Sequence, residues 1–224
     1  MSDPTEPTAP EEPKPKWRRR KDARPEELVN AALALFVEQG FATTNLKDVA
    51  RAAGVSKGTV YLYFKSKEDL LLEVVRSAVV PIMDFADDEE LSSDEPASVL
   101  LARLLRRWMQ EFEDRGLSGV PKLVMAESGN FPELAQQYVD LVVQRARRLF
   151  ARVLKRGVTT GEFRPLDVRQ TVQLLLAPLA YAHVHKHSLG PYDPGMLALD
   201  TYLDLHLDLF LRGIRADPGA DDDR

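Results

Sequence analysis

A short stretch near residue 55 groups side chains that could bind duplex DNA. Residues 53–64 read AGVSKGTVYLYF and bring Lys57, Thr59, Tyr61 and Tyr63 close together in the chain. Lysine can reach a phosphate or a guanine, hydroxyl groups can bond phosphates, and the apolar parts of threonine and tyrosine can touch thymine methyl groups. Gly58, in their midst, would let the backbone approach a duplex closely.

The local sequence also predicts the helices that would position these groups. Leu46 and Val49 begin an apolar stripe at helical spacing, and Gly54 follows as a residue able to turn the chain left-handed. Ser56 is a good cap for a second helix running from about 57 to 64. Helix, glycine turn and helix form the helix-turn-helix arrangement, here over about 45–64, whose second helix can enter the major groove.

Charge is unevenly distributed along the chain. The net charge of all 224 residues is -5, but residues 14–67 hold 12 Lys or Arg against 5 Asp or Glu. A polyanion meets one face of a protein and not its average charge, so this basic region favours a nucleic-acid partner. Arg18, Arg19 and Arg20 precede the first expected helix and are predicted to add salt-dependent phosphate binding.

The whole chain is predicted to be all-α, with about nine helices. Residues 1–21 hold an acidic, proline-rich tail and the basic arm, and the tail is expected to be disordered, as are residues 214–224. Residues 22–82 are expected to form the DNA-binding domain, and residues 83–213 a larger helical domain. The segment LDLHLDLFL alternates like a strand, but Asp200, Asp204, Asp208 and Arg212 are four apart and favour a helix; strand is kept as the alternative.

Residues 25–75 resemble the DNA-binding domain of the TetR family of bacterial regulators. The resemblance is carried by AALALFVEQGFATTNLKDVARAAGVSKGTVYLYFKSKEDLL, where about a dozen family positions agree in order and spacing. It implies that Thr44 is a phosphate-contacting helix cap, and that Tyr63 and Lys67 bind the phosphate backbone. Leu62 departs from the pattern, since many members carry a polar or basic residue there. The predicted DNA-binding set is Arg18, Arg19, Arg20, Thr44, Lys47, Lys57, Gly58, Thr59, Tyr61, Tyr63 and Lys67.

The C-terminal part is similar to that of AcrR-like members of the same family, which implies small-molecule sensing and dimerisation. Large or polar-tipped residues among aliphatic ones predict a pocket for a mostly hydrophobic ligand, with simple core packing as the alternative. The pocket candidates are Trp108, Phe112, Met125, Tyr138, Tyr181 and His183. Apolar positions on the last two helices predict a dimer interface, with internal core as the alternative: Leu175, Leu179, Leu203, Leu207 and Phe210.

Other classes of protein fit the sequence poorly. There is no cysteine, no long apolar run that would span a membrane and no secretory leader pattern, so a cytoplasmic protein is expected. His183, His185 and His187 suggest a metal, but no carboxylate or cysteine nearby would complete a site, so neither metal nor cofactor is expected. No nucleophile–base arrangement or phosphate-binding loop suggests an enzyme.

The sequence therefore predicts a transcription regulator. We expect a homodimeric repressor that binds an inverted-repeat operator and is released by a small ligand. The alternative is a ligand-independent DNA-binding dimer, whose C-terminal domain serves only dimerisation or protein recruitment.

Overall fold

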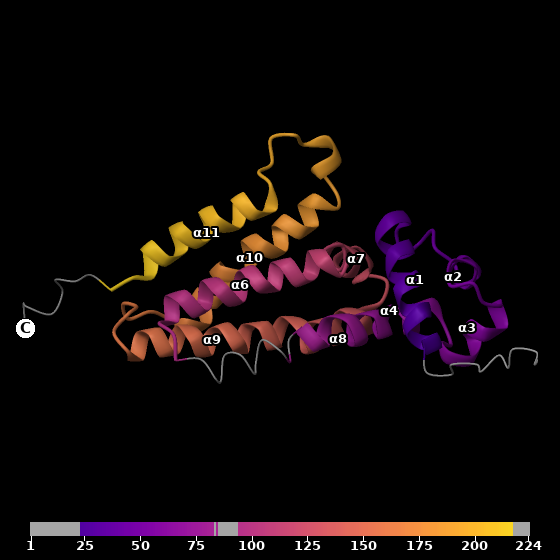
Figure 1. The fold of residues 1–224 in the computed structure, drawn as a ribbon, viewed down its shortest axis with the longest axis horizontal. Coiled ribbons are helices and arrows are strands. Elements are labelled where there is room, and N and C mark those ends of the chain that lie inside the picture. Colours follow the sequence, from indigo (N-terminus) through magenta and orange to yellow (C-terminus); the bar gives the residue numbers. More distant parts are fainter. Residues whose placement is uncertain (1–22, 83, 85–93, 217–224) are drawn as a thin grey trace, which may run out of the picture.

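The computed structural model describes residues 23–82, 84 and 94–216, and the regular elements in these ranges are helices (Figure 1). Within them no β-strand forms, and the one isolated bridge pairs Phe163 with Arg215. The all-α prediction is confirmed. No helix in the described ranges is both long and apolar enough to cross a membrane.

Four helices form the N-terminal unit, at the right of Figure 1: α1 (Ala23–Gln39), α2 (Leu46–Ala52), α3 (Lys57–Tyr63) and α4 (Lys67–Val74). Their starts are set by side chains that accept hydrogen bonds from free helix amides. Asn45 caps α2, Ser56 caps α3 and Ser66 caps α4. Gly54 has a φ of 64°, which lets it make the turn between α2 and α3.

Longer helical rods form the rest of the molecule. The helix α4 continues into a π-helical turn, η1 (Val75–Val79). In the same way α8 (Pro132–Tyr138) runs through η2 (Val139–Val143) into α9 (Gln144–Thr159). The other helices are α6 (Ala97–Asp114), α7 (Val120–Glu127), α10 (Val168–Lys186) and α11 (Leu199–Ile214), with a short 3-10 turn η3 (Gly190–Tyr192) before α11.

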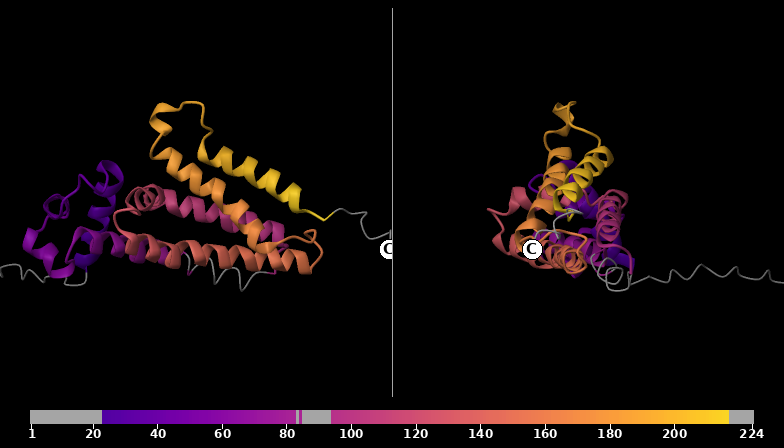
Figure 2. Two further views of the ribbon diagram at one scale, coloured as in Figure 1. Left: turned by 180° about the vertical axis from the view of Figure 1, so that it is seen from behind. Right: turned by 90° about the vertical axis from the view of Figure 1, so that its left-hand side faces the viewer.

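The second unit is elongated, and its helices lie side by side. Figures 1 and 2 show α6, α9 and α10 along its length and α11 on its outer edge, with the N-terminal unit at the opposite end from the α9–α10 connection. The LDLHLDLFL segment lies inside α11, so the strand alternative is wrong. Its leucines alternate, but a helix lets it bury one set of them against α10 and α6.

Two buried apolar clusters hold the molecule together. One lies between α6, α9, α10 and α11. The other begins in α1–α4 and continues into α7, α8 and η2, so it spans the predicted boundary at residue 82. Aromatic rings mark this continuity: Phe41 lies 5.2 Å from Phe36 and 5.3 Å from Phe131, measured between ring centroids. The N-terminal unit therefore shares its core with the helices that follow it.

The predicted dimer-interface residues need correction. Leu175, Leu179, Leu203 and Leu207 are at most 4% exposed and belong to the second cluster, and Phe210 is partly buried against it. Pairing α10 with α11 inside one chain uses this face of both helices. Other large apolar side chains of α10 and α11 are the ones left exposed: Leu174, Tyr181, Leu205 and Leu209.

Candidate DNA-binding surface and ligand cavity

The helix α3 is held to the core by one face and leaves the other in solvent. Val60 is fully buried and Phe64, just beyond the helix, is 5% exposed. On the outer side, Tyr61 is 50% exposed, Leu62 80% and Tyr63 38%. The predicted DNA-contacting tyrosines therefore stand on the surface, as does Leu62.

The side chains of Lys57 and Thr59 differ in how far contacts within the helix already engage them. The ammonium of Lys57 lies 5.5 Å from the centroid of the Tyr61 ring, one helical turn along, and the side chain is exposed. The hydroxyl of Thr59 is 2.9 Å from that of Ser56, whose oxygen also accepts from the Thr59 amide. Thr59 is thus partly occupied in capping its own helix.

Gly58 is not required by the fold. Its φ is ordinary, and a Cβ built on it would meet only the Ser56 hydroxyl, at 3.8 Å. Glycine in a helix costs about 0.5–1 kcal/mol relative to alanine. An exposed helical glycine with open space around it is therefore better explained by a partner molecule that approaches the backbone of α3 closely.

Thr44 does not have the role that the resemblance implied. Thr44 is 1% exposed, and the single hydrogen of its hydroxyl is shared between the carbonyl oxygens of Gly40, at 2.8 Å, and Leu35, at 3.3 Å. Asn45 is the cap of α2 instead. Thr44 therefore fixes the α1–α2 loop and does not present its hydroxyl to a phosphate.

Lys67 also serves the fold. Its ammonium donates to the carbonyl oxygens of Phe41 (2.7 Å), Ala42 (3.2 Å) and Thr44 (3.1 Å). It also lies 4.4 Å from the centroid of the Phe41 ring. An ammonium has three hydrogens, and all three are used here. The ammonium of Lys67 therefore holds the loop before α2 closed, and it is not free for the predicted phosphate contact.

Of the remaining predicted DNA contacts, the structure describes only Lys47. Lys47 is exposed on α2, near Arg51, which forms an ion pair with Asp48. Arg18, Arg19 and Arg20 lie outside the described residues. Lys47, Lys57, Gly58, Tyr61, Leu62 and Tyr63 make up what we call the α3 surface.

A cavity of about 290 Å³ opens between α6, α7, the α8–α9 rod and α10. Five of the six predicted pocket residues line it: Trp108, Phe112, Met125, Tyr138 and His183. Tyr181 does not; it is 55% exposed, with its ring 5.7 Å from that of His185. Its side chain therefore points away from the cavity, although Ala177, four residues earlier on α10, lines it.

Aromatic rings form one wall of the cavity. Trp108 stacks on Phe150 with centroids 5.7 Å apart and meets Phe112 edge-on at 5.8 Å. Phe112 in turn stacks on His183, also at 5.8 Å. Most other lining residues are aliphatic, so the interior suits an apolar molecule.

Two polar lining residues were missed from the sequence, Arg147 and Gln173. Arg147 forms no ion pair with the residues that the structure describes, and it brings a positive charge to the cavity wall. It follows Tyr138, Val142 and Val143 at helical spacing along the rod, and that periodicity could have pointed to it.

A polar cluster adjoins His183, which is 5% exposed. Burial lowers the pKa of His183 to about 4, so its ring is neutral at neutral pH. Its Nε2 lies 3.8 Å from Oε1 of Glu113, and neither atom has a hydrogen-bond partner. Burial alone would raise the pKa of Glu113, but hydrogen bonds from Lys186 and Ser118 outweigh it and hold this pKa below its usual value.

The three histidines near the end of α10 face different partners. His183 faces Glu113, His185 bonds Asp193 at 3.0 Å, and His187 bonds Ser118 at 2.8 Å. Within the described ranges no group of three His, Cys, Asp or Glu side chains is arranged to hold a metal ion.

Comparison with known families and proteins gives the same assignment for both units. Residues 28–74 match the model of bacterial regulatory proteins of the tetR family, and residues 100–198 match a tetracyclin repressor-like C-terminal domain. The chain is 30% identical over 152 residues to the HTH-type transcriptional repressor KstR2 of Mycobacterium tuberculosis, covering 66% of this chain and 73% of the relative.

Two further matches come from Bacillus subtilis, one a sequence and one a solved structure. The fatty acid metabolism regulator protein is 26% identical over 163 residues, which is 71% of this chain and 82% of the relative. The crystal structure of the regulator FadR in complex with stearoyl-CoA has the same fold, with a TM-score of 0.72 at 23% identity, covering 85% of this chain and 99% of that one. With both units matched and KstR2 this similar, the chain belongs to the TetR family of bacterial DNA-binding transcription regulators.

Proposed function

We propose that this regulator is a homodimeric repressor, acting in the bacterial cytoplasm, which binds an inverted repeat and is released by a small, mostly apolar ligand. The observation that carries the proposal is the α3 surface, where a basic residue, two tyrosines and an unneeded glycine share an exposed helix. Helix α3 would enter the major groove, and the other residues of the surface would contact phosphates.

Two copies are needed because a single α3 can read only a few base pairs. A two-fold dimer presents two reading helices at the spacing of the DNA helical repeat. The exposed apolar side chains of α10 and α11 supply a surface for that pairing. Leu174 is 68% exposed, Leu205 51% and Leu209 71%, and all three would gain by burial against a second copy.

The cavity favours an apolar ligand of modest size that also carries a polar group. Its volume of about 290 Å³ is at the low end for ligand sites. Arg147 offers a positive charge and His183 a neutral ring to the polar group. The names printed for two matches, a fatty acid metabolism regulator and a FadR structure in complex with stearoyl-CoA, support an acyl-type ligand.

A route from the cavity to the α3 surface runs through α7. Pro121 and Met125 of α7 line the cavity, and Gly119, just before α7, touches Val37 of α1. A second link joins Arg76 to Gln137 of α8, with 2.6 Å between nitrogen and oxygen. A ligand that fits only one spacing of these helices would shift the balance between DNA-binding and released forms.

Selection of duplexes from a random pool, followed by fluorescence anisotropy, tests the DNA-binding part. We expect enrichment of an inverted repeat. Gly58→Ala should bind this repeat at least tenfold more weakly because a methyl group then stands on the α3 surface, while its unfolding free energy stays the same or rises. Gly213→Ala is the matched control, since Gly213 lies in α11 with nothing within 4 Å of an added Cβ. Loss of binding in both variants, or in neither, would contradict the proposed role of α3.

Tryptophan fluorescence tests the ligand-binding part. The chain has two tryptophans, so Trp17→Phe leaves Trp108 as the sole reporter on the cavity wall. Titration with saturated fatty acids of increasing length should quench or shift its emission and release the DNA at the same concentrations. Ala180→Phe narrows the cavity and should abolish both effects without weakening DNA binding. A DNA complex that no compound in a broad lipophilic panel dissociates would favour the ligand-independent alternative.

A further inference from the structure

Three large side chains in a row stand exposed on α3. Tyr61, Leu62 and Tyr63 are 50%, 80% and 38% exposed. Runs of exposed apolar residues are disfavoured on a soluble surface unless a partner uses them. Leu62 is the most exposed of the three, and as a leucine it has no polar group with which to bond water.

Leu62 is not needed to hold α3 in place. It belongs to neither buried cluster, and the helix is held to the core by Val60 and Phe64. Gly58, Tyr61 and Leu62 are spaced three and four apart, so they share the outer face of the helix. Leu62 therefore lies on the face of α3 that a closely approaching duplex would contact.

The other side chains of α3 offer few of the usual hydrogen bonds to base edges. From Lys57 to Tyr63 the helix contains no Arg, Asn, Gln, Asp or Glu. Those side chains make the usual hydrogen bonds to guanine, adenine and cytosine in the major groove, and only Lys57 is left to read guanine. The hydroxyl of Thr59 is already in contact with Ser56. One further major-groove feature needs no hydrogen bond, the C5-methyl group of thymine, which apolar side chains contact.

We propose that Leu62 reads a thymine methyl group in each half-site of the operator. This rests on the proposed entry of α3 into the major groove. Because Gly58 on the same face has no side chain, the helix can come close enough for Leu62 to reach the base edges. The operator then carries a thymine at one fixed position in each half, where the discrimination is made by apolar contact.

Replacement of thymine by deoxyuridine tests this directly, because uracil keeps the hydrogen-bonding groups of thymine and lacks only the methyl. The duplex is the repeat selected by the wild-type protein, and each thymine is replaced in turn, symmetrically in both halves. At one position the replacement should weaken wild-type binding by about fourfold per half-site, the equivalent of one buried methyl-sized group. At the other positions the effect should be smaller than twofold.

Two variants show whether Leu62 is responsible. Leu62→Ala removes the contact, so this protein should bind the thymine and uracil duplexes alike, while Leu62→Met keeps an apolar contact and should keep the preference. Neither change removes a core residue, and helical content by circular dichroism should match the wild type. If Leu62→Ala binds too weakly for direct titration, a repeated selection with this variant should show no thymine preference at the position concerned.

The outcomes separate this inference from the proposed function. If the wild-type protein selects a repeat but no thymine in it is sensitive to loss of its methyl, the role of Leu62 is wrong and DNA recognition by α3 stands. The same holds if Leu62→Ala retains the sensitivity of the wild type. If no duplex is selected at all, the DNA-binding proposal fails, and the role of Leu62 with it.

Discussion

Gly119 and Val37 are packed together so closely that no side chain fits between them. A Cβ placed on Gly119 would lie 2.7 Å from Cγ1 and 2.9 Å from Cγ2 of Val37. Val37 is near the end of α1, and Gly119 immediately precedes α7, which contributes to the cavity wall. This contact makes the position of α7 depend on that of α1, and therefore ties the cavity to the DNA-binding unit.

The first prediction concerns this contact. Gly119→Ala should force α7 away from α1 and cost about 1–3 kcal/mol, as insertion of a methyl group into a packed interior does. It should also change the ligand concentration that releases DNA, because the two units no longer move together. Chemical denaturation and DNA-release titrations measure the two effects.

A double variant separates the effect of this close approach from general damage. Val37→Ala removes the methyl groups that the new Cβ would meet, so Gly119→Ala combined with Val37→Ala should be more stable than the sum of the single effects predicts. Gly129→Ala is the control, since an added Cβ there meets nothing within 4 Å. Strict additivity of the two stability changes would show that the close contact between positions 119 and 37 is not the cause of the loss in Gly119→Ala.

The second prediction contrasts two lysines of the N-terminal unit. Lys57→Ala should leave stability within about 0.5 kcal/mol, because the side chain is exposed. It should also lower the slope of log affinity against log salt by about one for each phosphate that the lysine no longer neutralises. Lys67→Ala should instead cost about 1–3 kcal/mol of stability, since it leaves the carbonyls of Phe41, Ala42 and Thr44 without their donor.

Denaturation curves and salt titrations of both variants give the comparison. If Lys67→Ala keeps its stability but lowers the salt slope as Lys57→Ala does, the role assigned to Lys67 by the family resemblance is right and the structural role is wrong.

Local signals in the sequence were enough to locate the helices and turns of the N-terminal unit. Gly54 and Ser56 mark the turn and the start of α3 because each solves a local problem, a left-handed backbone and unpaired amides. The roles of Thr44 and Lys67 were not predictable in this way. Lys67 is 23 residues beyond Thr44, and only the folded loop brings its ammonium to that carbonyl.

The helices that pair in the C-terminal unit raised a different difficulty. In α11 leucines cover most of the circumference. The apolar pattern therefore shows that several faces of the helix need a packing partner, but it does not show which face packs inside the chain and which faces another molecule. Leu203 and Leu207 turned out to face α10 and α6, and Leu205 and Leu209 face solvent. Both the internal packing of one chain and a contact between two chains require apolar residues such as leucine. Only the three-dimensional arrangement distinguishes the two.

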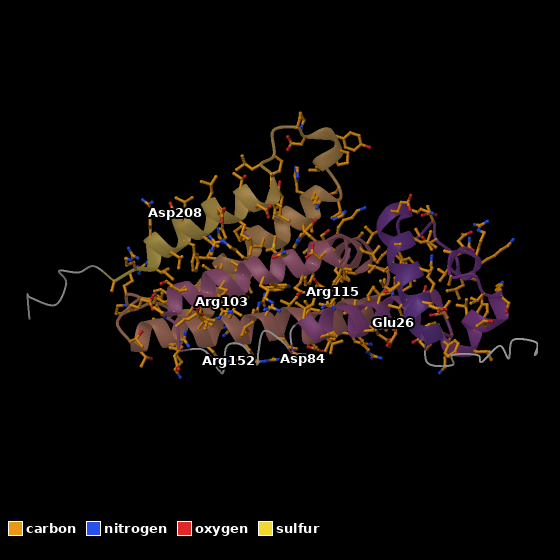
Figure 3. The ribbon with its side chains drawn as sticks, viewed as in Figure 1. Glu26, Asp84, Arg103, Arg115, Arg152 and Asp208 are labelled. Atoms are coloured by element: carbon orange, nitrogen blue, oxygen red, sulfur yellow. The ribbon has the colours of Figure 1, made fainter. Side chains whose placement is uncertain are left out.

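The third prediction uses this pair of faces on α11. Leu207 is 2% exposed and Leu209 71%, and Asp208 between them projects from the outer edge of the molecule (Figure 3). Leu207→Ala should cost about 2–5 kcal/mol of stability, as removal of a buried leucine side chain does. Leu209→Glu should leave the fold of each copy intact but place a charge in the proposed dimer contact, so that the protein sediments as a monomer.

Analytical ultracentrifugation and thermal melts of both variants check the assignment. Leu209→Ala is the milder companion, expected to weaken the dimer without adding charge. A Leu209→Glu protein that remains a full dimer and binds the repeat as the wild type does would place the dimer contact elsewhere.

The last prediction is a pH dependence of stability that originates at His183. The unfolded chain takes up a proton on this residue with the ordinary histidine pKa near 6.5, whereas burial lowers the pKa in the folded protein to about 4. Between these values the unfolded state binds more protons, so stability falls as the pH drops below about 6.5 and levels off near 4. The loss between pH 7.5 and pH 5 should be about 2 kcal/mol from His183 alone.

Its charged neighbours determine how this effect is isolated. Glu113 of α6 faces the ring, and Lys186 at the end of α10 and His187 just beyond it lie nearby. The pKa of Glu113 is held below its usual value, so its own contribution is lost only at more acid pH than this window. Burial also lowers the pKa of His187, which adds to the slope in the same direction.

Urea denaturation at pH 5 to 7.5 should therefore show a reduced pH slope for His183→Gln and the flattest profile for His183→Gln combined with His187→Gln. A slope in His183→Gln as steep as in the wild type would mean that this ring is protonated in the folded protein and that another group carries the dependence.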